Sequence, residues 1–184
     1  MKRIAVFCGS GLGKNEVYRQ QASLLGETIA RRGTGLVYGG GNAGLMKYVA
    51  DGALRQGGEV TGVIPAFLNR DEIAHAGLTE LIVVETMHER KRKMNELSDG
   101  FIALPGGYGT MDEFFEMITW EQLHLHQKPV ALLNANGFYT PLLRQIKMML
   151  NEGFLKESCR RLLIEDDSIS SLLEKMTSHH NNHL

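Results

Sequence analysis

The sequence lacks the features that would place the chain in a membrane or in an oxidising compartment. It has only two cysteines, Cys8 and Cys159, which are too few for a disulfide scaffold, and neither has a second ligand at zinc spacing. No apolar stretch reaches the ~20 residues that span a bilayer, and Gly9-Ser10-Gly11 interrupts the first apolar run too early for a signal peptide. We therefore expect a soluble, cytoplasmic protein that needs no membrane partner.

An excess of one charge is also missing. The formal net charge at pH 7 is -1, so the whole chain offers no field that would collect nucleic acid or an anionic membrane. The basic run Arg90–Lys93 has no aromatic residues interleaved with it, unlike sites that stack single-stranded bases. We expect no nucleic-acid partner, and any anion site must be local.

Length and hydrophobic content predict one compact domain. The chain has 184 residues, of which 43% are hydrophobic, and this is enough to bury a core. We place the domain at residues 1–177. Residues 178–184 are polar and His-rich without any period, which predicts an irregular tail rather than a metal site.

Short apolar runs alternate with longer stretches of helical spacing. The predicted strands are Ile4–Cys8, Gly35–Tyr38, Glu59–Ile64, Leu81–Val84, Phe101–Leu104, Pro129–Leu133 and Leu162–Ile164. The predicted helices are Glu16–Arg32, Leu45–Gln56, Met87–Leu97, Thr110–Leu123 and Tyr139–Glu152. Nearly continuous apolar strands suit a sheet that helices cover on both faces, so the fold class is α/β: a Rossmann-like, doubly wound parallel sheet. The segment Pro65–Thr79 has no period and is expected to be an irregular loop over a site.

Three glycine clusters follow three of these strands. They are Gly9–Gly13, Gly39–Gly44 and Gly106–Thr110, and each lies at the carboxyl end of a strand, where open α/β sheets bind their ligands. Glycine lets backbone N–H groups approach an anion, and a helix that starts directly afterwards adds free N–H groups and a positive dipole end. The sequence therefore predicts a phosphate site at this edge.

The spacing within the clusters limits the classes of ligand that the site could bind. Gly9–Gly13 does not fit the dinucleotide pattern, and no acid follows a second strand at the distance that would bind ribose. A Gly-Lys-Ser/Thr ending is also missing, which disfavours hydrolysis of ATP or GTP. A nucleoside 5′-monophosphate fits better than NAD or a triphosphate.

Two capping boxes begin helices near the predicted site. Thr110–Glu113 has the pattern of a capping box, in which Thr110 caps the helix, and this reading competes with a role in chemistry. Asp112 and Glu113 lie about 100° apart around the helix, so only one of them can face a ligand at the turn. The second box, Thr86–Glu89, opens the helix that carries the basic run.

That basic run is either a solvated helix face or part of the site. Met87, Arg90, Lys91 and Met94 share one face by helical spacing. Because the helix begins just after the strand Leu81–Val84, its first turns lie at the edge of the glycine clusters. This face could offer a guanidinium fork and a thioether to one ligand.

Taken together, these motifs resemble the LONELY GUY family of cytokinin-activating phosphoribohydrolases, long mislabelled as lysine decarboxylases. The family's PGGxGTxxE turn appears as Pro105–Glu113, its GGGxxGLM turn as Gly39–Met46, and its Met-x-x-Arg-Lys helix as Met87–Lys91. The resemblance covers Ile4 to about Glu174. It implies hydrolysis of the N-glycosidic bond of AMP or its prenylated derivative to the free base and ribose 5-phosphate.

The resemblance also implies roles for particular residues. Arg90 and Glu113 are the expected catalytic pair; a fixed carboxylate can stabilise positive charge on the anomeric carbon, and the guanidinium can stabilise either the departing base or the phosphate. Gly107, Tyr108, Gly109 and Thr110 are expected to hold the phosphate. Further substrate contacts are expected from Glu72, Met87, Lys91, Gly106, Met111, Asp112, Thr119, Gly9, Ser10, Gly40, Gly41 and Gly44. No metal or organic cofactor is implied.

The sequence departs from the family at three positions. Asp112 stands where glutamate is usual, Lys47 where glycine is common, and Gly11 where serine is frequent. Lys47 could change helix packing or the pocket entrance, and Gly11 could remove a hydroxyl contact. None of the three is in the expected catalytic pair.

Alternatives remain open at this point. A broader nucleoside monophosphate nucleosidase and a non-catalytic nucleotide or cofactor carrier both fit the fold, whereas lysine decarboxylation does not, because no lysine stands out as a Schiff-base candidate. Members of the family are typically dimers, so we expect a homodimer. Met117, Trp120 and Leu123 recur at helical spacing and belong either to the core or to that interface. His124 and His126 are expected in a polar surface turn.

Overall fold

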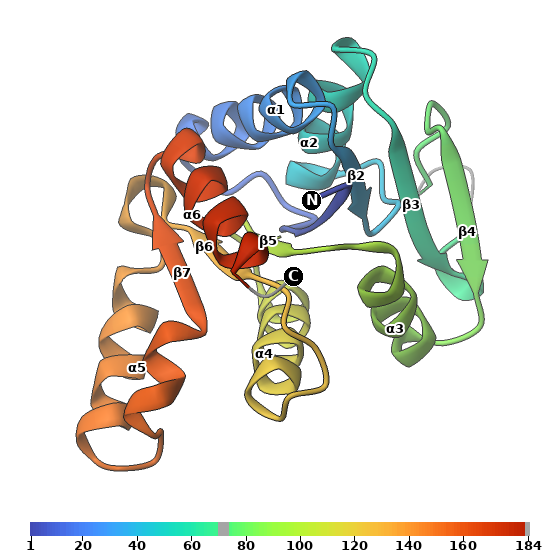
Figure 1. Ribbon diagram of the computed structural model, residues 1–184. Coiled ribbons are helices and arrows are strands. Elements are labelled where there is room, and N and C mark those ends of the chain that lie inside the picture. Colours follow the sequence, from blue (N-terminus) through green and yellow to red (C-terminus); the bar gives the residue numbers. More distant parts are fainter. Residues whose placement is uncertain (70–73, 183–184) are drawn as a thin grey trace.

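The computed structural model describes residues 1–69 and 74–182 and confirms the doubly wound parallel sheet (Figure 1). Over these residues the sheet has seven strands, in the order β4-β3-β2-β1-β5-β6-β7, and every pairing is parallel. The strands are β1 (Arg3–Phe7), β2 (Gly35–Tyr38), β3 (Val60–Pro65), β4 (Glu80–Val84), β5 (Phe101–Ala103), β6 (Val130–Leu133) and β7 (Leu163–Asp166). The order of the strands reverses between β1 and β5.

Helices cover both faces of the sheet. They are α1 (Glu16–Arg31), α2 (Gly44–Arg55), α3 (Met87–Leu97), α4 (Tyr108–Gln122), α5 (Thr140–Asn151) and α6 (Ile169–Asn181). Helices α1, α2 and α6 pack into one apolar layer and α3, α4 and α5 into the other, on opposite faces of the sheet (Figure 1). The central strands β1, β2, β5 and β6 are almost wholly buried, which explains why their sequences are continuously apolar.

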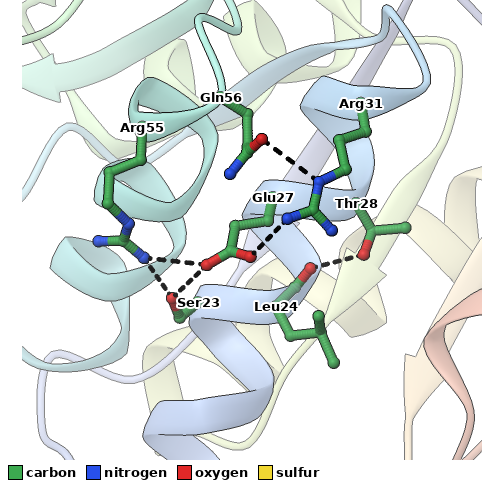
Figure 2. A network of polar contacts seen from close by, with 7 residues as sticks. All are labelled: Ser23, Leu24, Glu27, Thr28, Arg31, Arg55 and Gln56. Atoms are coloured by element: carbon green, nitrogen blue, oxygen red, sulfur yellow. Dashed lines mark hydrogen bonds and ion pairs between the residues drawn. The ribbon is translucent and has the colours of Figure 1, made fainter.

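Close approach of two glycines joins α1 to α2. A Cβ added at Gly26 would lie 2.0 Å from the carbonyl oxygen of Val49, and one added at Gly52 would lie 2.3 Å from that of Ser23. Arg55 on α2 also reaches Glu27 on α1, with 3.2 Å between its Nη2 and Glu27 Oε1 (Figure 2). The two helices therefore hold the first two glycine turns on one rigid unit.

One helix and part of the tail differ from the sequence expectations. Every predicted strand and helix is present with ends within two residues of those predicted, but α6 was missed. The sequence carries the helical period of α6, because its buried residues recur at helical spacing: Ile169, Leu172, Leu173 and Met176. The helix continues to Asn181, and the irregular tail predicted from residue 178 is therefore wrong over residues 178–181; residues 183–184 lie outside the described range.

The connection from β3 to β4 has no α-helix among its described residues. It contains a 3₁₀ turn, Ala66–Leu68, and it returns to the sheet edge where Ala74 pairs with Gly41 in an isolated antiparallel bridge. His75 strengthens this contact, because its N–H donates to the carbonyl oxygen of Gly40 over 3.0 Å. The loop after β3 is thus tied to the glycine turn after β2.

Over the described residues, no helix combines the length and the apolar character needed to cross a bilayer.

Candidate functional site

The three glycine clusters meet at one edge of the sheet. A Cβ at Gly44 would lie 2.2 Å from the carbonyl carbon of Ser10, and one at Gly106 would lie 2.9 Å from the nitrogen of Gly9. Hydrogen bonds join the same turns: the Gly9 N–H donates to the Pro105 carbonyl over 3.1 Å, and the Gly9 carbonyl accepts from the Leu45 N–H over 3.0 Å. The turns after β1, β2 and β5 therefore form one continuous backbone surface.

A cavity of about 310 Å³ opens on this surface. Gly9, Ser10, Gly106 and Gly107 contribute backbone to its lining. Its position, between the carboxyl ends of β1 and β5, is the point at which the strand order reverses, where doubly wound sheets bind ligands. Tyr18 and Phe138 supply aromatic walls, which sequence reasoning missed because no local motif marks either residue.

Helix α4 begins at the turn, two residues earlier than the sequence predicted. Gly107 is its N-cap and offers no side chain, so the predicted capping box at Thr110 is wrong. Thr110 lies instead in the first turn, 3% exposed, with its hydroxyl 2.1 Å from the place that a Cβ on Gly106 would take. The first N–H groups of the helix have no intrahelical acceptor and, with the helix dipole, they favour an anion.

Helix α3 begins at the capping box that the sequence predicted. Thr86 is the N-cap, and its hydroxyl accepts from Glu89 N–H over 3.1 Å. The Glu89 carboxylate accepts from Glu85 N–H over 2.8 Å, one residue earlier than the standard box would have it. This capped start fixes the first turns of α3 beside the glycine surface.

Arg90 and Glu113 meet between α3 and α4. Arg90 Nη1 lies 3.1 Å from Glu113 Oε1, and the side chains are only 11% and 7% exposed. Arg90 Nε also donates to the Val63 carbonyl over 3.0 Å, and Met87 Sδ lies 3.9 Å from Nη1. The guanidinium is thus fixed from two sides, and the carboxylate lies one helical turn beyond the glycine turn at the start of α4.

Burial dominates the electrostatics of this pair. Removal from water raises the pKa of Glu113, and the positive charge of Arg90 opposes that rise. Cys8, at the end of β1, is buried beside both side chains; burial and the Glu113 carboxylate raise the pKa of its thiol, while Arg90 opposes them. The Cys8 thiol therefore stays neutral at pH 7.

Lys91 points to α4 instead of the glycine surface. Its Nζ lies 3.1 Å from Asp112 Oδ2 and also contacts the carboxylate of Glu116. Asp112 is 59% exposed at its side chain while Glu113 is buried, so the two adjacent acids face different surroundings, as their helical spacing predicts. Sequence reasoning missed Glu116, although its spacing of three residues from Glu113 places both on neighbouring positions of one helix face.

Several other residues predicted to contact the substrate do not line the cavity at the glycine turns. Gly41 lies in the bridge to Ala74, and Gly40 has a positive φ of 74° and packs against Ile64. Thr119 is exposed and lines a groove between α4 and α5 instead of the cavity at the glycine turns. Glu72 lies outside the described residues.

A polar network on α2 holds the neighbouring loop. Asp51 accepts from Lys47 Nζ over 2.8 Å and contacts His75 Nε2 at 3.0 Å. The other ring nitrogen of His75 accepts from Gly77 N–H over 3.1 Å. Lys47, one of the departures from the family pattern, thus pairs along its own helix.

The described residues contain no group of three or more His, Cys, Asp or Glu side chains gathered as a metal site would require.

Comparison with known proteins places the chain among nucleotide-cleaving relatives. The family model described as "Possible lysine decarboxylase" matches residues 46–176. A "Probable cytokinin riboside 5'-monophosphate phosphoribohydrolase" of Oryza sativa subsp. japonica is 48% identical over 181 residues, which cover 98% of this chain and 81% of the rice protein. The cytokinin riboside 5'-monophosphate phosphoribohydrolase of Rhodococcoides fascians is 48% identical over 178 residues, covering 96% and 90% of the two chains.

Solved structures share the fold at lower identity. The molybdenum cofactor binding protein of Rippkaea orientalis is 25% identical with a TM-score of 0.73, and the alignment covers 97% of each chain. The Moco carrier protein of Chlamydomonas reinhardtii is 23% identical with a TM-score of 0.74 and covers 98% of each chain. The second likeness concerns the fold alone.

Proposed function

We propose that this chain, which belongs to the LONELY GUY family of cytokinin riboside 5′-monophosphate phosphoribohydrolases, hydrolyses the N-glycosidic bond of such a nucleotide. The products are the free base and ribose 5-phosphate. The observation that carries the proposal is the buried Arg90–Glu113 ion pair, 3.1 Å between nitrogen and oxygen, one turn along the helix that begins at the glycine surface. AMP, which lacks the prenyl group, is the second substrate we expect.

The glycine surface would hold the phosphate. Free N–H groups at the start of α4, around Tyr108–Thr110, and the backbone of Gly106 supply donors without side chains in the way. The site thereby binds a dianion although the chain has almost no net charge. Binding through the phosphate places the ribose within reach of the adjoining first turns of α3 and α4.

Glu113 and Arg90 would act on the sugar and the base. As the bond from the anomeric carbon to the base nitrogen breaks, positive charge develops on the sugar, and the Glu113 carboxylate, held against Arg90, stabilises it and orients the attacking water. The bonding electrons pass to the base, where the guanidinium of Arg90 offsets the gained charge. Water supplies the hydroxyl on the sugar and, in the end, the proton on the base.

Product analysis tests this proposal. Purified protein is incubated with isopentenyl-AMP and with AMP, and the free base and ribose 5-phosphate are quantified by chromatography. We expect both products from the wild type and a loss of at least ~100-fold in kcat for Glu113→Gln. Glu96→Gln is the matched control, because Glu96 is 52% exposed on α3, and it should keep the wild-type rate. Binding without cleavage by the wild type would contradict the proposal and favour a carrier.

We also propose that the chain forms a homodimer. The groove between α4 and α5 has a volume of about 600 Å³ and is lined by apolar residues such as Phe115, Ile146 and Leu150. No residue of α5 is buried, although the helix carries an apolar face that a second copy would cover. Light scattering after gel filtration should give twice the chain mass of 20.5 kDa; a mass of one chain would contradict this. The cytoplasmic location stays a prediction, to be checked by cell fractionation.

A further inference from the structure

Two consecutive residues of α3 form ion pairs with α4, in two adjoining layers. Arg90 pairs with Glu113, and Lys91 pairs with Asp112 and Glu116. The second layer is asymmetric, because Lys91 is 7% exposed and Glu116 21% exposed at the side chain, whereas Asp112 is 59% exposed. The buried part of this layer is therefore the Lys91–Glu116 contact.

The contact with Glu116 stabilises the buried positive charge of Lys91, which burial alone would disfavour. Burial works to lower the pKa of Lys91, but the hydrogen bonds that its ammonium donates to Glu116 and to Asp112 outweigh burial, and the pKa is raised. Lys91 thus stays charged at neutral pH between two carboxylates. A buried ammonium held in this way sets the distance and rotation of the two helices that carry the catalytic pair.

We propose that Lys91, together with Glu116, is a positioning residue that holds and electrostatically tunes Glu113, and does not contact the substrate phosphate. This inference rests on the proposed function. The inference depends on where the Lys91 ammonium points. It points at the carboxylates of α4, whereas the proposed phosphate donors are backbone groups at the start of that helix. Engaging a phosphate would require Lys91 to break its ion pair with Glu116, whose side chain is only 21% exposed.

Charges surround Glu113 from each element that packs against it. Arg90 and Lys91 on α3 lower its pKa, and Asp112 and Glu116 on its own helix raise it. The Cys8 thiol of β1 lies on the third side. Removing Lys91 should therefore raise the pKa of Glu113, whereas removing the charge of Glu116 should lower it.

Kinetics of four variants test the inference. The set is Lys91→Met, Lys91→Arg, Glu116→Gln and the double variant Lys91→Met/Glu116→Gln, each assayed with AMP or isopentenyl-AMP from pH 4 upwards. For Lys91→Met we expect kcat to fall roughly 10- to 100-fold while KM changes less than about threefold. The acidic limb of kcat/KM should move to higher pH. Lys91→Arg keeps the cation and should recover most of kcat.

The two remaining variants separate charge from packing. Glu116→Gln should move the acidic limb to lower pH, in the direction opposite to Lys91→Met, and the double variant should return it toward the wild-type position. A purely structural role would lower activity without these opposed shifts. Lys93→Met and Glu96→Gln are matched controls, since both residues are exposed on α3 and pair with each other at 3.5 Å; neither should move the limb.

The outcomes distinguish this inference from the proposed function. If Lys91→Met raises KM more than tenfold and leaves the acidic limb in place, Lys91 is a phosphate contact and the inference is wrong. If the Lys91→Met protein does not fold, the pH profile of Glu116→Gln tests the inference. An acidic limb of kcat/KM that stays at the wild-type position in this variant would also overturn the inference. If the wild type itself releases no base, the proposed function fails. The binding constant of ribose 5-phosphate, measured by calorimetry, then tests the inference alone: Lys91→Met should leave it within about threefold, whereas a loss of more than tenfold would make Lys91 a phosphate contact.

Discussion

Gly39 makes room for the guanidinium of Arg90. A Cβ built on Gly39 would lie 1.9 Å from Arg90 Nη2 and 3.1 Å from its Cζ, so no other residue fits there while the guanidinium keeps its place. This contact joins the glycine turn after β2 to α3, the helix that carries Arg90. The first glycine of this turn thus has a steric function that is separate from phosphate binding.

Gly39→Ala should therefore act through Arg90. The added methyl group would displace the guanidinium from Glu113, and we expect kcat to fall about 100-fold, as for other misplacements of about 1 Å. Steady-state kinetics and the melting temperature are to be measured together. Gly35→Ala is the control, because its nearest neighbour is the flexible Cγ of Arg3 at 3.1 Å. Unchanged kcat in Gly39→Ala would show that Arg90 tolerates another position.

Gly106 and Gly107 are adjacent, yet their surroundings differ. A Cβ on Gly106 would lie 2.1 Å from the Thr110 hydroxyl, while one on Gly107 would meet nothing within 4 Å. We expect Gly106→Ala to lower the free energy of unfolding by ~1–3 kcal/mol and to raise KM, because the first turn of α4 must shift. Gly107→Ala should leave the unfolding midpoint in urea nearly unchanged. Equal losses of stability in both variants would contradict the close approach at Gly106.

At the crossing of α1 and α2, the contribution of close packing to stability can be compared with that of an exposed ion pair. Gly26→Ala forces a methyl group against the Val49 carbonyl, and we expect a loss of ~1–3 kcal/mol in urea unfolding. Arg55→Ala removes the bond to Glu27, but Arg55 is 53% exposed at its side chain, and such pairs contribute about 0–1 kcal/mol. A larger loss for Arg55→Ala than for Gly26→Ala would mean that the network of Figure 2 holds the helices together.

Local patterns in the sequence predicted most of the fold. The central strands β1, β2, β5 and β6 are buried on both faces, so their sequences are continuously apolar, and the helices that follow have a clear period. Side-chain capping predicted the start of α3 correctly at Thr86, but it failed at Thr110, because Gly107 begins α4 without a side-chain cap. A glycine cap leaves its N–H groups free, and its pattern in the sequence is weaker.

The site could be predicted only in part. Glycine turns at the carboxyl ends of parallel strands must share an edge, so their meeting follows from topology. The direction of Lys91 could not be read from the sequence, because helical spacing places it beside Arg90 without saying which neighbour it meets. Tyr18 and Phe138 reach the cavity from distant parts of the chain, which only tertiary packing brings together.

His126 was expected in a polar surface turn, but the structure half-buries it. Its Nδ1 accepts from Lys128 N–H over 3.1 Å, its Nε2 is buried, and its ring lies 5.4 Å from that of Phe101. Burial first, and then the charge of Lys128, lower its pKa to about 4, against the hydrogen bond to the Met117 backbone. The imidazole in the folded chain is therefore neutral at pH 7.

This lowered pKa predicts a loss of stability in acid. The unfolded chain binds a proton at His126 near pH 6.5 and the folded chain only near pH 4, so the free energy of unfolding should fall as pH decreases through this window. Because water screens the half-buried ring, we expect a fall of ~1–2 kcal/mol, less than the full shift would give. In His126→Asn the amide oxygen can still accept from Lys128 N–H, but the side chain cannot titrate. As the pH falls from 6.5 to 4, the wild type should lose stability and the variant should not. The difference between their free energies of unfolding should therefore shrink or reverse over this range. His124→Asn is the control, because His124 is exposed and has a φ of 60°, which asparagine adopts readily. Urea unfolding at successive pH values measures both, and parallel pH profiles for the wild type and His126→Asn would show that His126 titrates alike in the folded and unfolded chain.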